Sequence, residues 1–205
     1  HVGWRFHVCG GGVRLEMTWT GVRTDLEQLP GSGKNYLTVG RWVDISNDRV
    51  GVTWSTLDAP LIEVGAIHMD VATPLSSEAW IRHLGPSQTV LSYLMNNYWE
   101  TNYKASQDGK VIFRYSIRPH GPYDQVAATR FAVERSQPLI VVPTDGATPV
   151  RPSRLEILGD GVLITSLKPI DDGEGLVLRL WNAGQNATQA TINWSEPAPR
   201  RVFRN

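Results

Sequence analysis

The sequence predicts an all-β protein of antiparallel strands with one or two short helices. The chain has 205 residues, of which eight are tryptophan and nineteen are glycine. Aromatic residues favour strands, and glycine is common in the turns between them. Residues 13–20 alternate strictly between apolar and polar side chains, as a half-buried strand does. Only residues 121–137 carry convincing start and stop signals for a helix.

Composition indicates an ordinary globular protein and limits its partners. Hydrophobic residues make up 41% and charged residues 20% of the chain, and twenty basic residues balance twenty acidic ones. Nucleic acid and anionic membranes are therefore not expected as partners. The single cysteine, Cys9, excludes an internal disulfide and a zinc site of several thiolates, and we expect it in a turn or small buried position. With no long apolar run, we expect a soluble protein, with the cytoplasm favoured.

The first third of the chain predicts several strands. Residues 1–6 alternate and form the first. In residues 13–20, one set of side chains is predicted to face the core (Val13, Leu15, Met17, Trp19) and the other to face solvent (Arg14, Glu16, Thr18, Thr20). Residues 36–45 and 50–54 form a hairpin around a turn at 46–49. Residues 61–64 form a short strand, and 67–71 another.

The middle of the chain contains an unusual polar stretch. Residues 90–95 are apolar, and residues 96–104 then bring together asparagines, aromatics and a lysine. A turn at Asp108-Gly109 leads into an alternating strand over 111–117, so the stretch predicts two strands joined by this turn. Amide groups and aromatic rings together are typical of a sugar site. One or two helical turns are expected over 76–84.

The last part predicts a helix and a second domain. In the helix over 121–137, five residues fall roughly along one side (Val126, Ala127, Arg130, Phe131, Glu134). A short strand over 139–142 follows. We assign residues 1–142 to a large β-domain, 143–152 to a proline-rich linker and 153–205 to a small β-sandwich. Its strands are predicted at 155–158, 162–167, 176–181 and 188–194.

No motif in the chain specifies a reaction. Carboxylates that occur mostly in turns are candidates only by residue type (Asp44, Asp48, Asp58, Asp70), since spacing does not pair carboxylates in an all-β chain. His68 and Asp70 share a face of the predicted strand over 67–71, which suits either a metal site or, more commonly, a surface hydrogen-bonded pair. The other histidines have no partner by spacing (His7, His83, His120).

Six segments resemble the C-terminal β-rich region of glycoside hydrolase family 38, the retaining α-mannosidases. The most specific are GVTWSTLDAPL at 51–61 and SYLMNNYWETNYK at 92–104. The others are GRWVDISN at 40–47, FRYSIRPH at 113–120, ERSQPL at 134–139, and the pattern from LKP at 167–169 through GLVLRL at 175–180. The resemblance spans nearly the whole chain.

The resemblance implies a fragment without the catalytic machinery. In that family an N-terminal α/β domain holds the zinc ion, the nucleophilic Asp and the acid/base Asp, and a helical bundle follows it. Neither matches this sequence, so no catalytic residue, no metal ligand and no cofactor are assigned here. The matching part resembles the large antiparallel supersandwich, of the galactose-mutarotase-like type and lacking its first strands, followed by a small terminal β-sandwich.

The resemblance also implies that the polar stretch lies near a sugar. Part of the family's β-region leans over the active site, so residues of this stretch are assigned to the border of the sugar cleft (Asn97, Trp99, Asn102, Tyr103). Family members with an arginine-rich turn at this place differ, because this chain has no arginine there. The alternative is that Tyr98 and Trp99 are core or domain-interface aromatics and that the asparagines satisfy loop backbone.

Two functions from different classes follow. In the first, the chain is the non-catalytic C-terminal domain of an α-mannosidase-like hydrolase, inactive alone, which packs against the catalytic and helical domains and borders a cleft for mannose-containing glycans. In the second, it is a free-standing carbohydrate-binding module that uses Trp99 and Tyr103. A generic protein-interaction sandwich is a third option. An apolar docking face would be exposed under the first function, and the fragment could form a homodimer through it.

Overall fold

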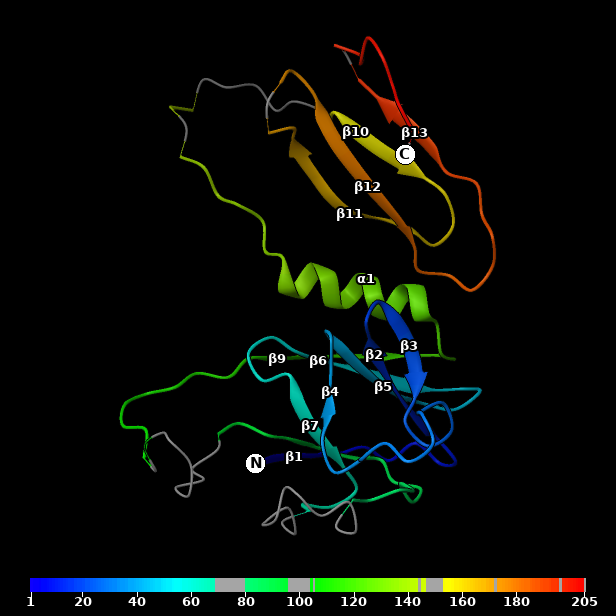
Figure 1. The fold of residues 1–205 in the computed structure, drawn as a ribbon, viewed down its shortest axis with the longest axis vertical. Coiled ribbons are helices and arrows are strands. Elements are labelled where there is room, and N and C mark those ends of the chain that lie inside the picture. Colours follow the sequence, from blue (N-terminus) through cyan, green and yellow to red (C-terminus); the bar gives the residue numbers. More distant parts are fainter. Residues whose placement is uncertain are drawn as a thin grey trace. The chain divides into compact units, whose positions relative to one another are not determined.

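The computed structural model describes residues 1–68, 80–95, 104, 106–143, 145–146, 153–171, 173–195 and 197–204. The chain divides into two units, His1–Gln137 and Pro138–Asn205. Every strand pair is antiparallel, and the described residues contain one helix (Figure 1). The all-β antiparallel fold class predicted from the sequence is therefore confirmed.

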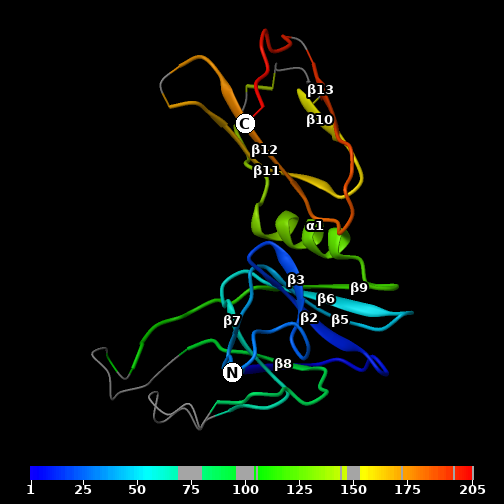
Figure 2. The ribbon, with the colours of Figure 1, turned by 45° about the vertical axis from the view of Figure 1, so that its right-hand side comes forward.

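The first unit contains two antiparallel sheets. The four-stranded sheet has the order β1-β8-β7-β4, with β1 at Val2–Arg5, β8 at Thr89–Ser92, β7 at Leu61–Val64 and β4 at Leu37–Thr38. The five-stranded sheet has the order β3-β2-β5-β6-β9, with β3 at Thr20–Arg23, β2 at Gly12–Met17, β5 at Trp42–Ser46, β6 at Gly51–Thr56 and β9 at Tyr115–His120. Figure 2 shows β8 beside the start of the chain, as its pairing with β1 requires.

The two sheets share one apolar core. Alternate residues of β2, β5 and β6 in the five-stranded sheet meet alternate residues of β7 and β8 in a single cluster (Val13, Leu15, Val43, Ile45, Trp54, Ile62, Val64, Val90). Tyr115 stacks on Trp54 with ring centroids 5.2 Å apart, and its hydroxyl donates to Ser92 Oγ at 2.9 Å. Because β9 carries Tyr115 and β8 carries Ser92, this bond also ties one sheet to the other.

The opposite face of the five-stranded sheet is polar and yet buried at its centre. Asp44 is fully buried and pairs in register with Arg14 on β2 and Thr53 on β6. Its Oδ1 accepts a hydrogen bond from Ser46 Oγ at 2.6 Å, and its Oδ2 accepts one from Thr53 Oγ1 at 2.8 Å. The ring of His120 on β9 places Nε2 2.7 Å from the same Oδ2. One carboxylate therefore joins β5, β6 and β9.

Helix α1, Gln125–Ser136, covers part of this polar face (Figure 1). The Asp124 side chain caps its first turn by accepting from the Ala127 N–H. The helix contacts β5 and β6 through small residues, and Trp42 Nε1 donates to Thr129 Oγ1 at 3.2 Å. The predicted helix is confirmed, and its buried residues are Ala128, Thr129 and Ala132.

The second unit consists of two antiparallel strand pairs. Strand β10, Leu155–Leu158, pairs with β13, Thr191–Trp194. Strand β11, Val162–Pro169, pairs with β12, Leu176–Asn182, with an irregularity between Ile164 and Ser166. The four strands predicted for this part of the chain are therefore present, β13 being shorter at its start.

Three local expectations were wrong. Strands β8 and β9 do not form a hairpin through Asp108-Gly109, because β8 pairs with β1 and β7 while β9 pairs with β6 in the other sheet. Residues 111–114 are not in a strand, since β9 begins at Tyr115. Residues 139–142 form no strand either and are largely exposed, with Leu139 at 95%.

The alternation over residues 13–20 predicted only in part which side chains are buried and which are exposed. Glu16 is 1% exposed, although it was expected in solvent, because its carboxylate accepts a hydrogen bond from Arg41 and lies against Gly40. Trp19 is 39% exposed, although it was expected in the core, because the strand ends at Met17. Thr18 and Trp19 instead form the turn between β2 and β3, both with positive φ.

Some expectations fall largely outside the described residues. The strand predicted over 67–71 and the helix predicted over 76–84 include residues 69–79, which the structure does not describe, and residues 67–68 and 80–84 belong to no strand or helix. The strand predicted over 36–45 is two strands, β4 and β5, interrupted at residues 39–41. Within the described residues, no helix has the length and apolar character needed to cross a membrane.

Replacing the buried carboxylate tests the central network. Asp44→Asn puts an amide group among three side chains that all direct donors at Asp44, so one donor loses its acceptor. We expect a loss of about 3–5 kcal/mol in the free energy of unfolding, measured by urea denaturation. Asp58→Asn is the matched control, because Asp58 binds only Arg114, a largely exposed partner, and should cost far less. Equal losses in the two variants would refute a special role for Asp44.

The turn between β2 and β3 gives a second test. Thr18 has φ of 49°, which is strained for a β-branched residue and well tolerated by asparagine. Thr18→Asn should therefore raise the free energy of unfolding by up to about 1 kcal/mol in thermal or urea unfolding. Thr20→Asn in β3 is the control, and it should not stabilise the protein. A lower free energy of unfolding in Thr18→Asn than in the wild type would contradict backbone strain at Thr18.

Candidate functional site

The residues assigned from the sequence to a sugar site lie outside the described residues. Asn97, Trp99, Asn102 and Tyr103 all fall within residues 96–103. The structure describes the chain up to Met95, directly after strand β8. The residues at the end of β8 are therefore the described part of the chain that directly precedes that stretch in the sequence.

A buried carboxylate lies on the neighbouring strand β7. Glu63 is fully buried, although Ile62 and Val64 on either side of it occupy the apolar core on the opposite face. Its Oε2 accepts a hydrogen bond from the His68 backbone N–H at 2.6 Å, and His68 Nδ1 lies 3.2 Å from the same oxygen. The Nε2 of His1 lies 2.7 Å from Oε1. Two imidazole rings thus flank one carboxylate.

The hydrogen bonding of this carboxylate is incomplete. Among the described residues, no donor is aligned for a hydrogen bond to Glu63 Oε1, and His68 Nδ1 also has no aligned partner. The His1 contact is short but poorly aligned, so it acts as a contact between polar groups and not as a full hydrogen bond. A buried carboxylate oxygen without a donor is costly for a folded protein. This oxygen is therefore the unsatisfied point of the cluster, enclosed beside the His1 ring.

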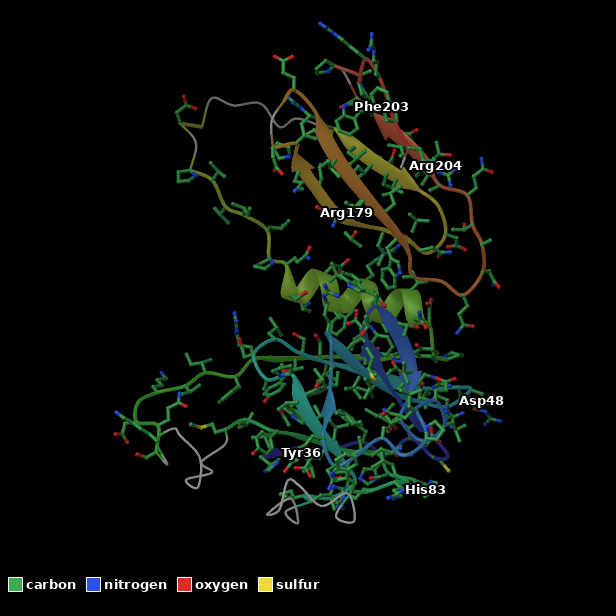
Figure 3. All side chains as sticks on the ribbon, viewed as in Figure 1. Tyr36, Asp48, His83, Arg179, Phe203 and Arg204 are labelled. Carbon is green, nitrogen blue, oxygen red and sulfur yellow. The ribbon has the colours of Figure 1, made fainter. Side chains whose placement is uncertain are left out.

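Two tyrosines stand beside the carboxylate. The Tyr93 ring meets the rings of His1 and Tyr36 edge to face, with centroids 4.7 Å and 5.3 Å apart. Burial raises the pKa of the Tyr36 phenol, and the negative charge of Glu63 raises it further. Figure 3 labels Tyr36 on the side of the first unit where the chain begins.

A small hollow of about 160 Å³ adjoins Tyr36 and is lined also by Gly33, Asn35 and Trp80. The Trp80 indole lies 3.4 Å from where a Cβ at Gly33 would be, so the glycine lets the ring approach the backbone. Asn35 Oδ1 accepts from the Ile81 N–H at 2.9 Å and so holds the Trp80 segment in place. Trp80 remains 42% exposed. The hollow therefore presents an aromatic face to solvent.

The cluster around Glu63 has the composition of a carbohydrate site. Carboxylate and amide oxygens accept hydrogen bonds from sugar hydroxyls, and aromatic rings cover the C–H faces of sugars. The sequence analysis missed this cluster. The available signal was Glu63 itself, a charged residue in the middle of the short apolar strand predicted over 61–64.

The other candidate carboxylates have partners of their own. Asp44 is enclosed by the network described above, and Asp58 binds Arg114 through both carboxylate oxygens at 2.8 and 3.1 Å. Asp48 lies exposed in the turn between β5 and β6. His120, for which spacing gave no partner, pairs with Asp44.

The metal hypothesis for His68 and Asp70 stays a prediction. The structure brings His68 to Glu63, while Asp70 lies outside the described residues. In the part of the chain that the structure describes, no three His, Cys, Asp or Glu side chains are arranged to hold a metal ion. Cys9 is exposed, with its thiol free, next to Gly10 in a turn.

Comparison with known proteins does not identify the chain. No family model matches it, and no curated protein matches it significantly.

The coupling between Glu63 and Tyr36 can be measured. Glu63→Gln removes a negative charge that opposes ionisation of the phenol, so the pKa of Tyr36 should fall. It should remain above the ordinary value of 10.0, because burial is the larger cause and persists in the variant. An NMR titration of the tyrosine ring carbons measures this shift. Glu16→Gln is the control and should leave the Tyr36 titration unchanged, and an unchanged titration in Glu63→Gln would contradict the coupling.

Proposed function

We propose that this chain is the non-catalytic, C-terminal β-rich part of an α-mannosidase-like glycoside hydrolase. In this role it packs against a catalytic domain and borders the cleft that holds a mannose-containing glycan. The proposal rests on the resemblance of the six sequence segments to glycoside hydrolase family 38. Zinc and the two catalytic carboxylates belong to the catalytic domain of that family and not to this chain.

The non-catalytic role is supported by the positions of three of those segments in the fold. Segments 40–47, 51–61 and 113–120 contain β5, β6 and β9, which are neighbours in the five-stranded sheet. Their polar residues bind one another, Asp44 to His120 and Asp58 to Arg114. A carboxylate engaged by several donors in the interior is poorly suited to attack a sugar or to transfer a proton. The segments thus support a role in building the fold.

The cluster around Glu63 supports a place beside the sugar. Tyr93 contacts both His1 and Tyr36, and it follows β8 directly on the way to residues 96–103. The stretch assigned from the sequence to the sugar cleft therefore continues from this cluster. Under the proposal, Asn97, Trp99, Asn102 and Tyr103 extend the aromatic and amide surface that Tyr36 and Trp80 begin.

Exposed apolar residues support the packing role. Leu139, Ile140 and Val141 are exposed by 95%, 90% and 89%, and Phe203 near the end of the chain by 82%. Contiguous apolar residues at such exposure mark surfaces that other proteins or domains cover. Under the proposal, the catalytic and helical domains of the same polypeptide cover them.

An activity assay tests the first part of the proposal. Retaining glycoside hydrolysis needs a nucleophilic carboxylate and an acid/base carboxylate roughly 5 Å apart at the scissile bond. We therefore expect no turnover of an aryl α-mannoside by this chain, with zinc added. Turnover that follows the protein peak through purification and is lost in Glu63→Gln would overturn the non-catalytic role.

The alternative is a free-standing carbohydrate-binding module, which the hollow at Tyr36 and Trp80 favours. An exposed indole and a neighbouring amide suffice for weak sugar binding, with about 1 kcal/mol for each aromatic contact. Backbone chemical shifts measured during titration with mannose oligosaccharides separate the two functions. Shifts that centre on Trp80 and disappear in Trp80→Ala favour the module, with Trp19→Ala as a control for an exposed tryptophan elsewhere. No shifts at millimolar sugar favour the scaffold.

A further inference from the structure

A second and larger hollow lies at the other end of the five-stranded sheet from the turn at Thr18 and Trp19. The cleft has a volume of about 700 Å³. Its walls come from residues 10–14, 23–25, 46–48, 84–87 and 122–123 of the first unit, together with Val64 on β7. Figure 3 labels Asp48, on its rim, on the opposite side of the unit from Tyr36. The cleft shares no lining residue with the hollow at Tyr36 and Trp80.

The two arginines that line this cleft differ in whether they pair with a carboxylate. Arg23 binds Asp25 with two hydrogen bonds, at 2.8 and 3.2 Å, so these two side chains neutralise one another. Arg14 also lines the cleft, but it has no carboxylate within ion-pair distance among the described residues. Its guanidinium lies over the Tyr123 ring, 4.4 Å from the centroid. Its guanidinium donates one hydrogen bond within the described residues, to Ser46 Oγ, and this bond is long at 3.4 Å.

The nearby Asp44 is held by other side chains and not by Arg14. Its oxygens accept hydrogen bonds from Ser46 Oγ and Thr53 Oγ1, and His120 Nε2 lies 2.7 Å from Oδ2. Among the described residues, the Arg14 guanidinium makes no ion pair with this carboxylate and reaches only the Ser46 hydroxyl beside it.

The walls of the cleft suit a small negative group. Gly10, Gly11 and Gly12 carry no side chains, and Gly10 has φ of 67°, so this wall exposes backbone. Burial, and then the charge of Asp44, raises the pKa of the Tyr123 phenol. The phenol therefore stays protonated, and its hydroxyl donates to Gln125 Oε1 at 3.4 Å, so Tyr123 offers the cleft its ring as the support of Arg14. Asp48 stands exposed on the rim, where water screens its repulsion.

We propose that this cleft binds an oxyanion, such as the phosphate group of a sugar phosphate or free phosphate, with the Arg14 guanidinium as its main contact. A planar guanidinium held on an aromatic ring is preorganised to donate two parallel hydrogen bonds to such a group. This inference does not depend on the proposed function, because it uses neither the resemblance nor the cluster around Glu63.

Titration of the full chain with inorganic phosphate, mannose 6-phosphate and mannose tests the proposal, read by backbone amide shifts. Phosphate and mannose 6-phosphate should both shift the amides of residues 10–14 and 46–48, and mannose should not. Tighter binding of mannose 6-phosphate than of phosphate would identify a sugar phosphate as the ligand, and equal binding would identify the anion itself. The proposal is overturned if neither anion shifts these amides, or if mannose shifts them equally.

Two arginine variants complete the test. Arg14→Met keeps an apolar side chain on the Tyr123 ring but removes the charge, and it should weaken phosphate binding by about tenfold or more. Arg118→Met is the matched control, because Arg118 lies in the same register row of the sheet, on β9, and does not line the cleft. It should leave binding unchanged. Equal weakening in both variants would overturn the role of Arg14, while the wild-type titration remains decisive if Arg14→Met does not fold.

Discussion

The hydrogen-bonded carboxylate of Asp44 is the constraint around which the first unit is arranged. It joins three adjacent strands, because Ser46 lies on β5, Thr53 on β6 and His120 on β9. Charges removed from water are tolerated only where partners fill their hydrogen-bonding positions. A shift of β6 or β9 by one residue would turn Thr53 or His120 to the apolar face and leave Asp44 without donors. The network therefore fixes the register of these strands.

This polar layer also explains how the helix is held. The inner face of α1 is made of small residues, Ala128, Thr129 and Ala132, and offers little apolar area. A helix of this kind gains less from the hydrophobic effect than one with a leucine stripe. Close approach to the sheet and the bond from Trp42 to Thr129 compensate in part. Trp42 is fully buried and is the largest side chain of the apolar cluster that it forms with Ala128 and Ala132.

The sequence predicted side-chain burial correctly wherever burial follows the local alternation of apolar and polar residues. Val13 and Leu15 were expected in the core and are there, and the hairpin of β5 and β6 was predicted from its turn. Alternation does not reveal whether the second face of a sheet is also covered. Glu16 was therefore placed in solvent, although Arg41 and Gly40 enclose it. Nor does it tell which strands pair, since a turn at Asp108-Gly109 is compatible with strands in two different sheets.

The candidate site was less accessible to prediction, for a physical reason. The residues around Glu63 come from the start of the chain and from the segments that precede β4 and follow β7 and β8, and only the folded chain brings His1, Tyr36 and Tyr93 together. The hint in the sequence lay in the neighbouring stretch 96–103, because asparagines and aromatics are concentrated there in consecutive residues.

Asp44 and Glu63 show how the two kinds of buried carboxylate differ. Both are fully buried on the face of a strand that points away from the apolar core, and both have a histidine within ion-pair distance. Asp44 receives donors at both oxygens, so further binding would have to break existing bonds. Glu63 keeps one oxygen without an aligned donor among the described residues, as Glu16 does at Oε2. What distinguishes Glu63 from both structural carboxylates is that its incomplete hydrogen bonding is combined with two imidazole rings and the neighbouring tyrosines, and this combination makes its surroundings the candidate site in this fold.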